Sequence, residues 1–331
     1  MTSPHPDPAP ATRPDDAADR SPAPGDATVT DVLIVGGGPA GLAAATVLGR
    51  SRRSVVVVDS GEPRNAPAAG AHNVLGLEGT PPRDILDRGR RESERYGVPH
   101  IRARVTDAGR DSDLLTVTTD DGRTLRGRRL LLATGLTDVL PDIPGLDEGW
   151  GRDVLHCPYC HGWEVRDKRI AVIAATPQST HQALLFANLS DRVTFVTGTV
   201  ELDDDQRSLL ARAGVETVGS PVTRVSRPRG VGGVVHLHLA NGTEMEVDAV
   251  AVGPSFESNT ELYERLGGTP AEHPMGHHIP AEPTGRTPLD GVWAAGNAGD
   301  LMAMVESSAA AGVTAGSMIN AELVMADLPP A

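Results

Sequence analysis

Short apolar runs that end in glycine turns recur along the chain. Residues 32–35 read Val-Leu-Ile-Val and run into a glycine-rich turn, and residues 42–50 then carry apolar side chains at helical spacing. Residues 55–58 are four consecutive valines, followed by Asp59. Apolar runs of this length, bounded by turns, are typical of strands buried on both faces of a parallel sheet. The order predicts a strand–helix–strand unit with glycines at its first turn.

The same alternation returns further along the chain. Residues 130–135 form another apolar run that reaches a glycine, and the Pro-rich residues 140–145 follow as an apparent exit from a domain. A second unit is predicted as a strand at 169–174, a helix at 180–189 and a strand at 193–196. Near the C-terminus we expect a strand at 291–297 and a long helix at 306–325. The predicted fold class is α/β, with two tandem Rossmann-like dinucleotide-binding domains.

Composition narrows the possible partners. The chain has 331 residues, 44 of them acidic and 30 basic, and its net charge is −14. Nucleic acids and anionic membrane surfaces attract basic patches, so we expect neither as a partner. We find no window of about 18 apolar residues for a membrane span and no secretory signal. We therefore expect a cytoplasmic protein, a setting in which disulfides are usually catalytic. Residues 1–28, mostly Pro, Ala, Asp and Ser, should be a disordered tail.

The first glycine turn has the pattern of a dinucleotide site. Gly36, Gly38 and Gly41 follow a predicted strand and open a predicted helix. Gly36 would make the tight turn, Gly38 would let backbone amides approach a pyrophosphate, and Gly41 would let the helix pack closely on the sheet. The helix N-terminus adds partial positive charge, and Asp59 would accept hydrogen bonds from a ribose. A glycine turn without a ligand is the alternative.

The second unit lacks this pattern. Ala174 and Thr176 stand where the first two glycines of a nucleotide fingerprint belong, and a β-carbon there keeps the backbone from a pyrophosphate. An NADPH 2′-phosphate favours arginines after the next strand, yet residues 203–205 are all aspartate. We expect the domain to persist without a nicotinamide ligand.

Cys157 and Cys160 are the only cysteines in the sequence, and they stand at Cys-x-x-Cys spacing. A disulfide that closes so short a loop adds little stability and is more often reactive than structural. A zinc site would need two further ligands, and His273, His277 and His278 match only loosely. We expect redox chemistry and no metal, with an inert packed pair as the alternative.

In their order, these motifs resemble the low-molecular-weight thioredoxin reductase family of flavoproteins. The shared motifs are Gly36-x-Gly38-x-x-Gly41, Asn73 and Gly76 in the following loop, Ala133-Thr134-Gly135, Cys157-x-x-Cys160 and Gly291-Val292-Trp293-Ala294-Ala295-Gly296. Within the family, residues 59–65 and 157–164 are most similar to the FAD-dependent dithiol oxidases of natural-product pathways, such as the holomycin and gliotoxin enzymes.

The resemblance implies an FAD domain at 29–147 and 253–331, interrupted at 148–252 by a degenerate NAD(P)H-type domain that carries the cysteine pair. It also implies homodimers. The FAD-binding residues that it implies are Gly36, Gly38, Pro39, Ala40, Gly41, Asp59, Ser60, Arg64, Asn65, Asn73, Val105, Ala133, Thr134, Gly135, Gly296 and Asn297.

The resemblance also assigns roles around the cysteines. Cys157 would face the substrate and Cys160 the flavin. The reductases carry Asp directly after the second cysteine; here His161 stands there, and an imidazole can carry protons near neutral pH. Glu164 is a second candidate acid or base, although a surface carboxylate fits equally well. The reductases also have Asp where this chain has Asn297, which can still hydrogen-bond the cofactor.

The function expected on these grounds is FAD-dependent oxidation of a small-molecule dithiol to an intramolecular disulfide, with O2 as electron acceptor and H2O2 as product. One alternative is an NAD(P)H-dependent reductase of thioredoxin or a similar small protein. The other, from a different class, is a non-catalytic flavoprotein that senses redox state or binds a ligand.

Overall fold

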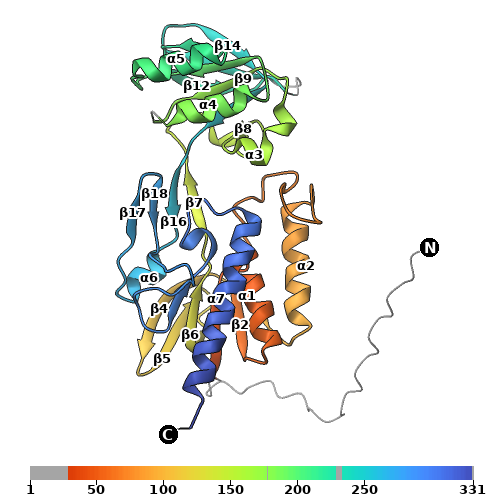
Figure 1. Cartoon of the computed structure of the whole chain (residues 1–331), viewed down its shortest axis with the longest axis vertical. Helices are drawn as coiled ribbons and strands as arrows, with labels where there is room; N and C mark the ends of the chain where they lie inside the picture. Colours follow the sequence, from red (N-terminus) through yellow and green to blue (C-terminus); the bar gives the residue numbers. More distant parts are fainter. Residues whose placement is uncertain (1–28, 177, 229–232, 330–331) are drawn as a thin grey trace, which may run out of the picture.

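Two α/β domains, joined by a pair of strands, make up the described part of the chain in the computed structural model, residues 29–176, 178–228 and 233–329 (Figure 1). The predicted fold class is confirmed: both domains are Rossmann-like and lie in tandem. The predicted tail at residues 1–28 lies outside the described residues.

The first domain is built on a mixed sheet whose buried strands are the apolar runs of the sequence. Its strands are β1 (Val29–Val35), β2 (Val55–Asp59), β3 (His100–Arg102), β4 (Val105–Asp111), β5 (Leu114–Thr119), β6 (Thr124–Leu132) and β19 (Val292–Ala294). Their order is β3-β2-β1-β6-β5-β4, with β19 beside β6. The pairs β1–β2, β1–β6, β2–β3 and β6–β19 are parallel, whereas β4, β5 and β6 form an antiparallel meander.

Three helices cover one face of this sheet: α1 (Pro39–Arg50), α2 (Pro82–Glu94) and α7 (Val305–Ala326) (Figure 1). The helix α7 packs along α1, and glycine allows the close approach. A β-carbon at Gly312 would lie 2.0 Å from the carbonyl oxygen of Ala40, and one at Gly316 would lie 3.1 Å from that of Ala44. The short helix α6 (Glu261–Arg265) brings Tyr263 to the opposite face.

The helix α7 corrects one expectation from the sequence. It is long and apolar enough to cross a membrane, with a mean hydropathy of 1.2 in its most apolar window, so the inference that no such window exists was wrong. A helix packed in a protein core meets the same criteria. Ala315, Ile319 and Leu323 of α7 are fully buried in one core cluster with Trp293.

The second domain has a fully parallel sheet between two unlike layers. Its strands are β8 (Val154–Leu155), β9 (Ile170–Ile173), β10 (Val193–Val196), β11 (Glu216–Val218) and β15 (Ala249–Val252), in the order β11-β10-β9-β15-β8. The helices α4 (Ser179–Ala187) and α5 (Asp204–Arg212) cover one face. An antiparallel sheet of β12 (Val222–Ser226), β13 (Val235–Leu239) and β14 (Glu244–Val247) covers the other. The sequence did not predict this second sheet.

Two antiparallel strands connect the domains: β7 (Leu136–Val139) leads out of the first domain, and β16 (Ser255–Ser258) leads back (Figure 1). The hairpin of β17 (Ala271–His273) and β18 (Gly276–His278) extends this small sheet. His273, His277 and His278 lie on the hairpin, and the described residues contain no group of three metal-binding side chains.

We expect the substitution Gly312→Ala to lower the melting temperature. Alanine favours a helix by about 1 kcal/mol over glycine, but the new methyl group would press on the α1 backbone, and overpacking costs about 1–3 kcal/mol. The control is Gly89→Ala in α2, where the nearest neighbours of the β-carbon are atoms of the Leu42 side chain, with Cδ1 closest at 3.1 Å, rather than backbone atoms. Thermal unfolding followed by circular dichroism measures both variants, and equal melting temperatures would contradict the close-packing argument.

Candidate redox site

A cavity of about 1160 Å³ lies between the two domains. It is larger than the roughly 300–1,000 Å³ of pockets that hold drug-sized ligands, and so suits an extended ligand. The residues that the sequence singled out and that line the cavity are Gly36, Gly38, Pro39, Ala40, Asp59, Ser60, Arg64, Asn65, Val105, Ala133, Thr134, Gly135, Cys157, Cys160, His161, Gly296 and Asn297. Gly41, Asn73 and Glu164 are not among the lining residues.

The glycines of the first turn have different neighbours. A β-carbon at Gly36 would lie 2.1 Å from the Ala133 carbonyl oxygen, and one at Gly41 would lie 1.9 Å from the Gly36 carbonyl oxygen. These two positions are needed for packing. A β-carbon at Gly38 would meet nothing within 4 Å, and no side chain caps the N-terminus of α1. The open space and the free backbone N–H groups form a cradle in which the pyrophosphate of FAD fits.

Asp59 stands at the end of β2, beside this cradle. One of its carboxylate oxygens accepts a hydrogen bond from the Gly37 N–H at 2.9 Å, and the other accepts one from the Gly61 N–H at 3.1 Å. A carboxylate can accept about four hydrogen bonds. Asp59 can therefore accept further hydrogen bonds from the cavity, such as those that the hydroxyl groups of a ribose would donate.

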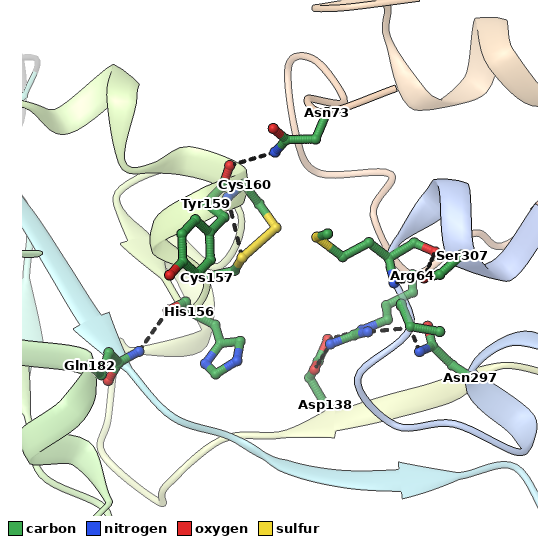
Figure 2. Close-up of a disulfide and its surroundings, with 12 residues drawn as sticks. Arg64, Asn73, Asp138, His156, Cys157, Tyr159, Cys160, Gln182, Asn297 and Ser307 are labelled. Carbon is green, nitrogen blue, oxygen red and sulfur yellow. Dashed lines mark hydrogen bonds and ion pairs between the residues drawn. A yellow bond between two sulfur atoms is a disulfide. The ribbon is translucent and has the colours of Figure 1, made fainter. Parts of the chain in front are cut away.

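Arg64 is anchored to the connecting strands (Figure 2). Its guanidinium makes two hydrogen bonds to the Asp138 carboxylate, at 2.6 and 2.7 Å, and lies 5.1 Å from the ring centroid of Phe256. It also donates to the Asn297 side-chain oxygen at 3.4 Å. Because Asp138 belongs to β7 and Phe256 to β16, Arg64 joins the cavity wall to both connections between the domains.

Asn297 holds the segment that leads into α7. Its side-chain NH2 group donates to the carbonyl oxygens of Asp300 and Ala303, each at 2.9 Å, and lies 3.4 Å from that of Leu301. The sequence predicted a contact between Asn297 and the cofactor, and this stays a prediction; these bonds use the amide donors. They also give a reason for Asn at this position, because an aspartate has no N–H to donate.

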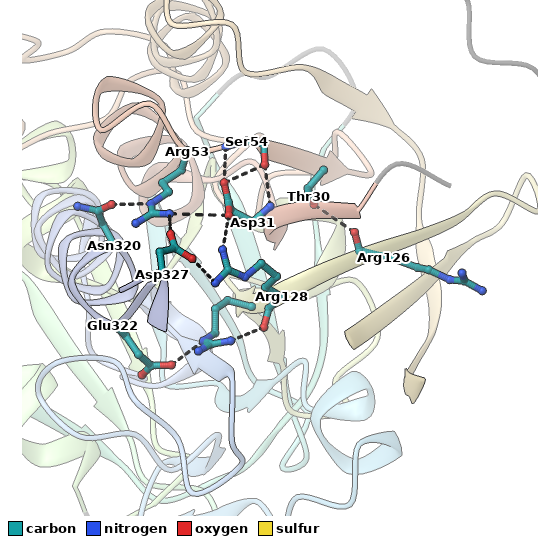
Figure 3. A network of polar contacts seen from close by, with 10 residues as sticks. Thr30, Asp31, Arg53, Ser54, Arg126, Arg128, Asn320, Glu322 and Asp327 are labelled. Atoms are coloured by element: carbon teal, nitrogen blue, oxygen red, sulfur yellow. Dashed lines mark hydrogen bonds and ion pairs between the residues drawn. The ribbon is translucent and has the colours of Figure 1, made fainter. Parts of the chain in front are cut away.

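The opposite end of α7 is fixed by a polar network (Figure 3). Asp327, which caps the C-terminus of α7, pairs with Arg53 and Arg128, each at 2.6 Å. These two arginines lower the pKa of the Asp327 carboxyl, Arg128 most strongly. Arg128 also bonds Asp31 of β1 at 2.9 Å. A carboxylate at a helix C-terminus is repelled by the negative end of the helix dipole, and the two arginines offset this repulsion. The N-terminal end of α7 lines the cavity.

The cysteine pair forms a disulfide at the cavity, on the side of the second domain (Figure 2). Cys157 caps the short helix α3 (Pro158–His161), and its sulfur accepts a hydrogen bond from the Cys160 N–H at 3.2 Å. Just before it, the His156 carbonyl accepts a hydrogen bond from the Gln182 side chain at 2.7 Å. The disulfide is thus held from both α3 and α4.

Two histidines beside the disulfide have nitrogens without a partner. His156 Nδ1 and His161 Nε2 are buried and make no hydrogen bond among the described residues. Burial lowers the pKa of both rings; the Glu164 carboxylate opposes this effect at His161. A neutral imidazole near pH 7 can accept a proton.

Contacts across the domain boundary hold the disulfide helix. The Asn73 side chain donates to the Tyr159 carbonyl at 2.8 Å (Figure 2), and His72 Nε2 lies 3.6 Å from a carboxylate oxygen of Glu164. His72 Nδ1 lies 2.7 Å from Glu78. Asn73, expected at the cofactor, bonds the neighbouring domain through its side chain, and its contact with FAD stays a prediction. Sequence reasoning missed His72 and Glu78, and their only signal was that they flank Asn73.

The described residues of the second nucleotide-type turn pair two of their N–H groups within the chain. Between β9 and α4, the N–H groups of Ala175 and Thr176 point at the Ser179 hydroxyl oxygen, at 3.1 and 3.3 Å. The acidic run after β10 has a structural role, because Asp203 caps α5 and accepts from the Gln206 N–H at 2.7 Å. Two N–H groups that a pyrophosphate could contact are thus already paired within the chain.

Comparisons with known proteins agree with this arrangement. The profile of a family described as pyridine nucleotide-disulphide oxidoreductase matches residues 30–312. Thioredoxin reductase tcpT of Claviceps purpurea is 32% identical over 316 residues, covering 91% of this chain and 96% of the relative. Thioredoxin reductase sirT of Leptosphaeria maculans is 32% identical over 327 residues, with the same coverage. The crystal structure of HlmI superposes with a TM-score of 0.84 at 38% identity, covering 90% of this chain and 94% of HlmI.

We expect Asn297→Asp to destabilise the protein by about 1–3 kcal/mol, because the half-buried Ala303 carbonyl would lose its donor and face a carboxylate. The control is Asn241→Asp. The Asn241 side chain only accepts, from the Thr243 N–H at 3.0 Å, which a carboxylate does equally well. Thermal unfolding and the amount of flavin that copurifies are the measurements. Equal losses in the two variants would contradict the role given to the Asn297 amide.

Proposed function

Because the chain belongs to the pyridine nucleotide-disulphide oxidoreductase family, we propose that it oxidises a small-molecule dithiol to an intramolecular disulfide and passes the electrons to O2. Within that family it is a thioredoxin reductase-like FAD enzyme with a disulfide-related redox role. One contrast carries the proposal. The disulfide lies at the cavity whose cradle suits FAD, whereas the N–H donors of the second cradle are paired with Ser179.

The thiol chemistry follows from the residues around the disulfide. His161 takes the proton of a substrate thiol, and the thiolate attacks Cys157 Sγ, so that the bond to Cys160 breaks and Cys160 leaves as a thiolate. The second substrate thiol, once deprotonated, attacks the first substrate sulfur and displaces Cys157. The N–H of Cys160 stabilises the thiolate that forms on Cys157, since it already donates to that sulfur.

The reaction balances in atoms, protons and electrons. One dithiol loses two protons and two electrons and becomes a cyclic disulfide, while the enzyme disulfide becomes a dithiol. Bound FAD supplies the route by which two electrons leave the enzyme dithiol and reach O2, which with two protons becomes H2O2. Protein partners are not needed in this scheme, and we further propose that the chain forms homodimers, as its family resemblance implies.

The purified protein with dithiothreitol under air should consume oxygen and release one H2O2 per O2. Cys157→Ser and Cys160→Ser should each reduce this turnover to the level of free flavin, because neither can re-form the disulfide. The visible spectrum must show that each variant still binds flavin, and a monothiol serves as the control substrate. Full activity in either variant would refute the cysteine mechanism.

Anaerobic mixing distinguishes the alternative reductase. We expect dithiothreitol to bleach the flavin and NADPH to leave it oxidised, because the N–H groups of Ala175 and Thr176 at the second turn are already paired with Ser179. Stopped-flow absorbance near the flavin band is the measurement. Rapid bleaching by NADPH would instead favour an NADPH-dependent disulfide reductase, and bleaching by neither donor would favour a non-catalytic flavoprotein.

A further inference from the structure

Four large apolar side chains are exposed around the disulfide. The exposed fraction is 92% for Leu75, 67% for Tyr159, 59% for Met302 and 47% for Met304. Single exposed apolar side chains are common on protein surfaces, but several gathered at one site mark a surface that a ligand or a partner covers. We call these four side chains the apolar rim.

The apolar rim draws on three segments that meet at the cavity. Tyr159 stands between the two cysteines in α3, and Met302 and Met304 line the same cavity as the disulfide. Leu75 belongs to the loop between β2 and α2. Two residues before it, the Asn73 side chain donates to the Tyr159 carbonyl at 2.8 Å and holds this loop against α3 (Figure 2). The rim is therefore part of the redox site.

The backbone that carries the two methionines is fixed, whereas their side chains can adapt. The Met302 N–H donates to the Asp300 carboxylate at 2.9 Å, and the Met304 N–H donates to the Ser307 hydroxyl at 2.8 Å. Methionine has three rotatable bonds and a polarisable thioether, so it fits ligands of different shape. A ligand can thus bury apolar surface here without first ordering the backbone.

Carboxylates stand beside the apolar rim. Glu306 accepts the Leu75 N–H at 2.6 Å, and Glu78 accepts the Asn73 N–H at 2.8 Å. Both side chains are exposed, and in the part of the chain that the structure describes neither forms an ion pair with lysine or arginine. The whole chain has a net charge of −14. A substrate that carries a carboxylate is therefore repelled as it approaches the disulfide, whereas an uncharged one is not.

We propose that the apolar rim binds the carbon skeleton of the substrate and, with the carboxylates beside it, selects an uncharged, apolar dithiol over a hydroxylated or carboxylate-bearing one. The proposal rests on the proposed function and names the chemical class of its dithiol. Apolar surface of the substrate leaves water when it contacts the rim, which favours binding. Because Tyr159 stands between the cysteines, a skeleton bound there has its S–H groups close to Cys157.

The first test uses two dithiols that differ only in polarity. Butanedithiol is dithiothreitol without its two hydroxyl groups. The rate of anaerobic flavin bleaching is measured against the concentration of each dithiol for the wild-type holoenzyme, Met302→Ser and Leu75→Ser. The control is Leu209→Ser in α5, where the leucine is also exposed but does not line the cavity. The intrinsic reactivity of each dithiol is the same for every variant, so the change in preference isolates the contact with the rim.

We expect the wild type to prefer butanedithiol and Met302→Ser to lower this preference about tenfold, as contacts in a hydrophobic pocket do. The loss should come from the half-saturating concentration of butanedithiol, with the plateau rate retained. Leu75→Ser should lower the preference in the same direction, and Leu209→Ser should match the wild type. The flavin spectrum and the melting temperature show whether each variant is folded. An unchanged preference, or equal losses for both dithiols, would overturn the proposal.

The second test isolates charge. Dihydrolipoamide and dihydrolipoate share one dithiol and differ in an amide in place of a carboxylate. At low ionic strength we expect dihydrolipoamide to bleach the flavin about threefold faster or more, and the difference to vanish near 1 M salt, where charges are screened beyond about 3 Å. Glu306→Gln should reduce the difference while keeping an oxygen for the Leu75 N–H. Equal rates at low ionic strength would contradict the selection by charge.

A second copy of the chain is the other occupant that the apolar rim could have. Size-exclusion chromatography of Met302→Ser and Leu75→Ser distinguishes it, because elution of either variant as a smaller species than the wild type would show that the rim is an interface, and would overturn the proposal. Unchanged elution is expected.

Failure of this proposal is separable from failure of the proposed function. If the dithiols bleached the flavin with the expected preferences but no oxygen was consumed, the oxidase function would fail and the role of the rim would stand. If oxygen consumption was normal but the preferences did not change in Met302→Ser, only the role of the rim would fail. If no dithiol bleached the flavin, both would fail.

Discussion

The hydrogen bond from the Asn73 side chain to the Tyr159 carbonyl, with the His72–Glu164 contact beside it, sets where the disulfide lies. Only β7 and β16 pass between the two domains as paired strands within the described residues, and such a narrow connection leaves the orientation to contacts of this kind. Arg64 adds to them by joining the cavity wall to Asp138 of β7. The redox chemistry depends on this relative orientation of the domains, because a disulfide displaced from the cavity could not exchange electrons with a group bound in the cavity.

The two nucleotide-type turns show how one fold supports different chemistry. Both place the N-terminus of a helix after a buried strand, and both therefore present backbone N–H groups. At the first turn the Gly37 N–H donates to Asp59, but Gly38 faces open space and no side chain caps α1, so a ligand can approach the start of the helix. At the second, the hydroxyl of Ser179 takes the donors of Ala175 and Thr176. Ser179 therefore pairs two N–H groups at the start of α4 that a pyrophosphate could otherwise contact.

Several elements were predictable because their determinants are local in the sequence. The valines at 55–58 form β2, the apolar run at 193–196 forms β10, and the predicted helix at 306–325 is α7 with one residue added at each end. The glycine turn and the Cys-x-x-Cys spacing indicated the nucleotide cradle and the disulfide. The connecting strands β7 and β16 were missed because each is four residues long and pairs with a segment more than 100 residues away.

The sequence by itself determined the two strand–helix–strand units, the glycine turn at residues 36–41 and the Cys-x-x-Cys pair, since each follows from residues close together in the chain. Only the tertiary structure decided what surrounds that pair. The Asn73 side chain bonds Tyr159 across the domain boundary, and the Asn297 side chain donates to backbone carbonyls. His72 and Glu164 are 92 positions apart, and no pattern of spacing brings them together. They meet because two separately folded domains pack against each other.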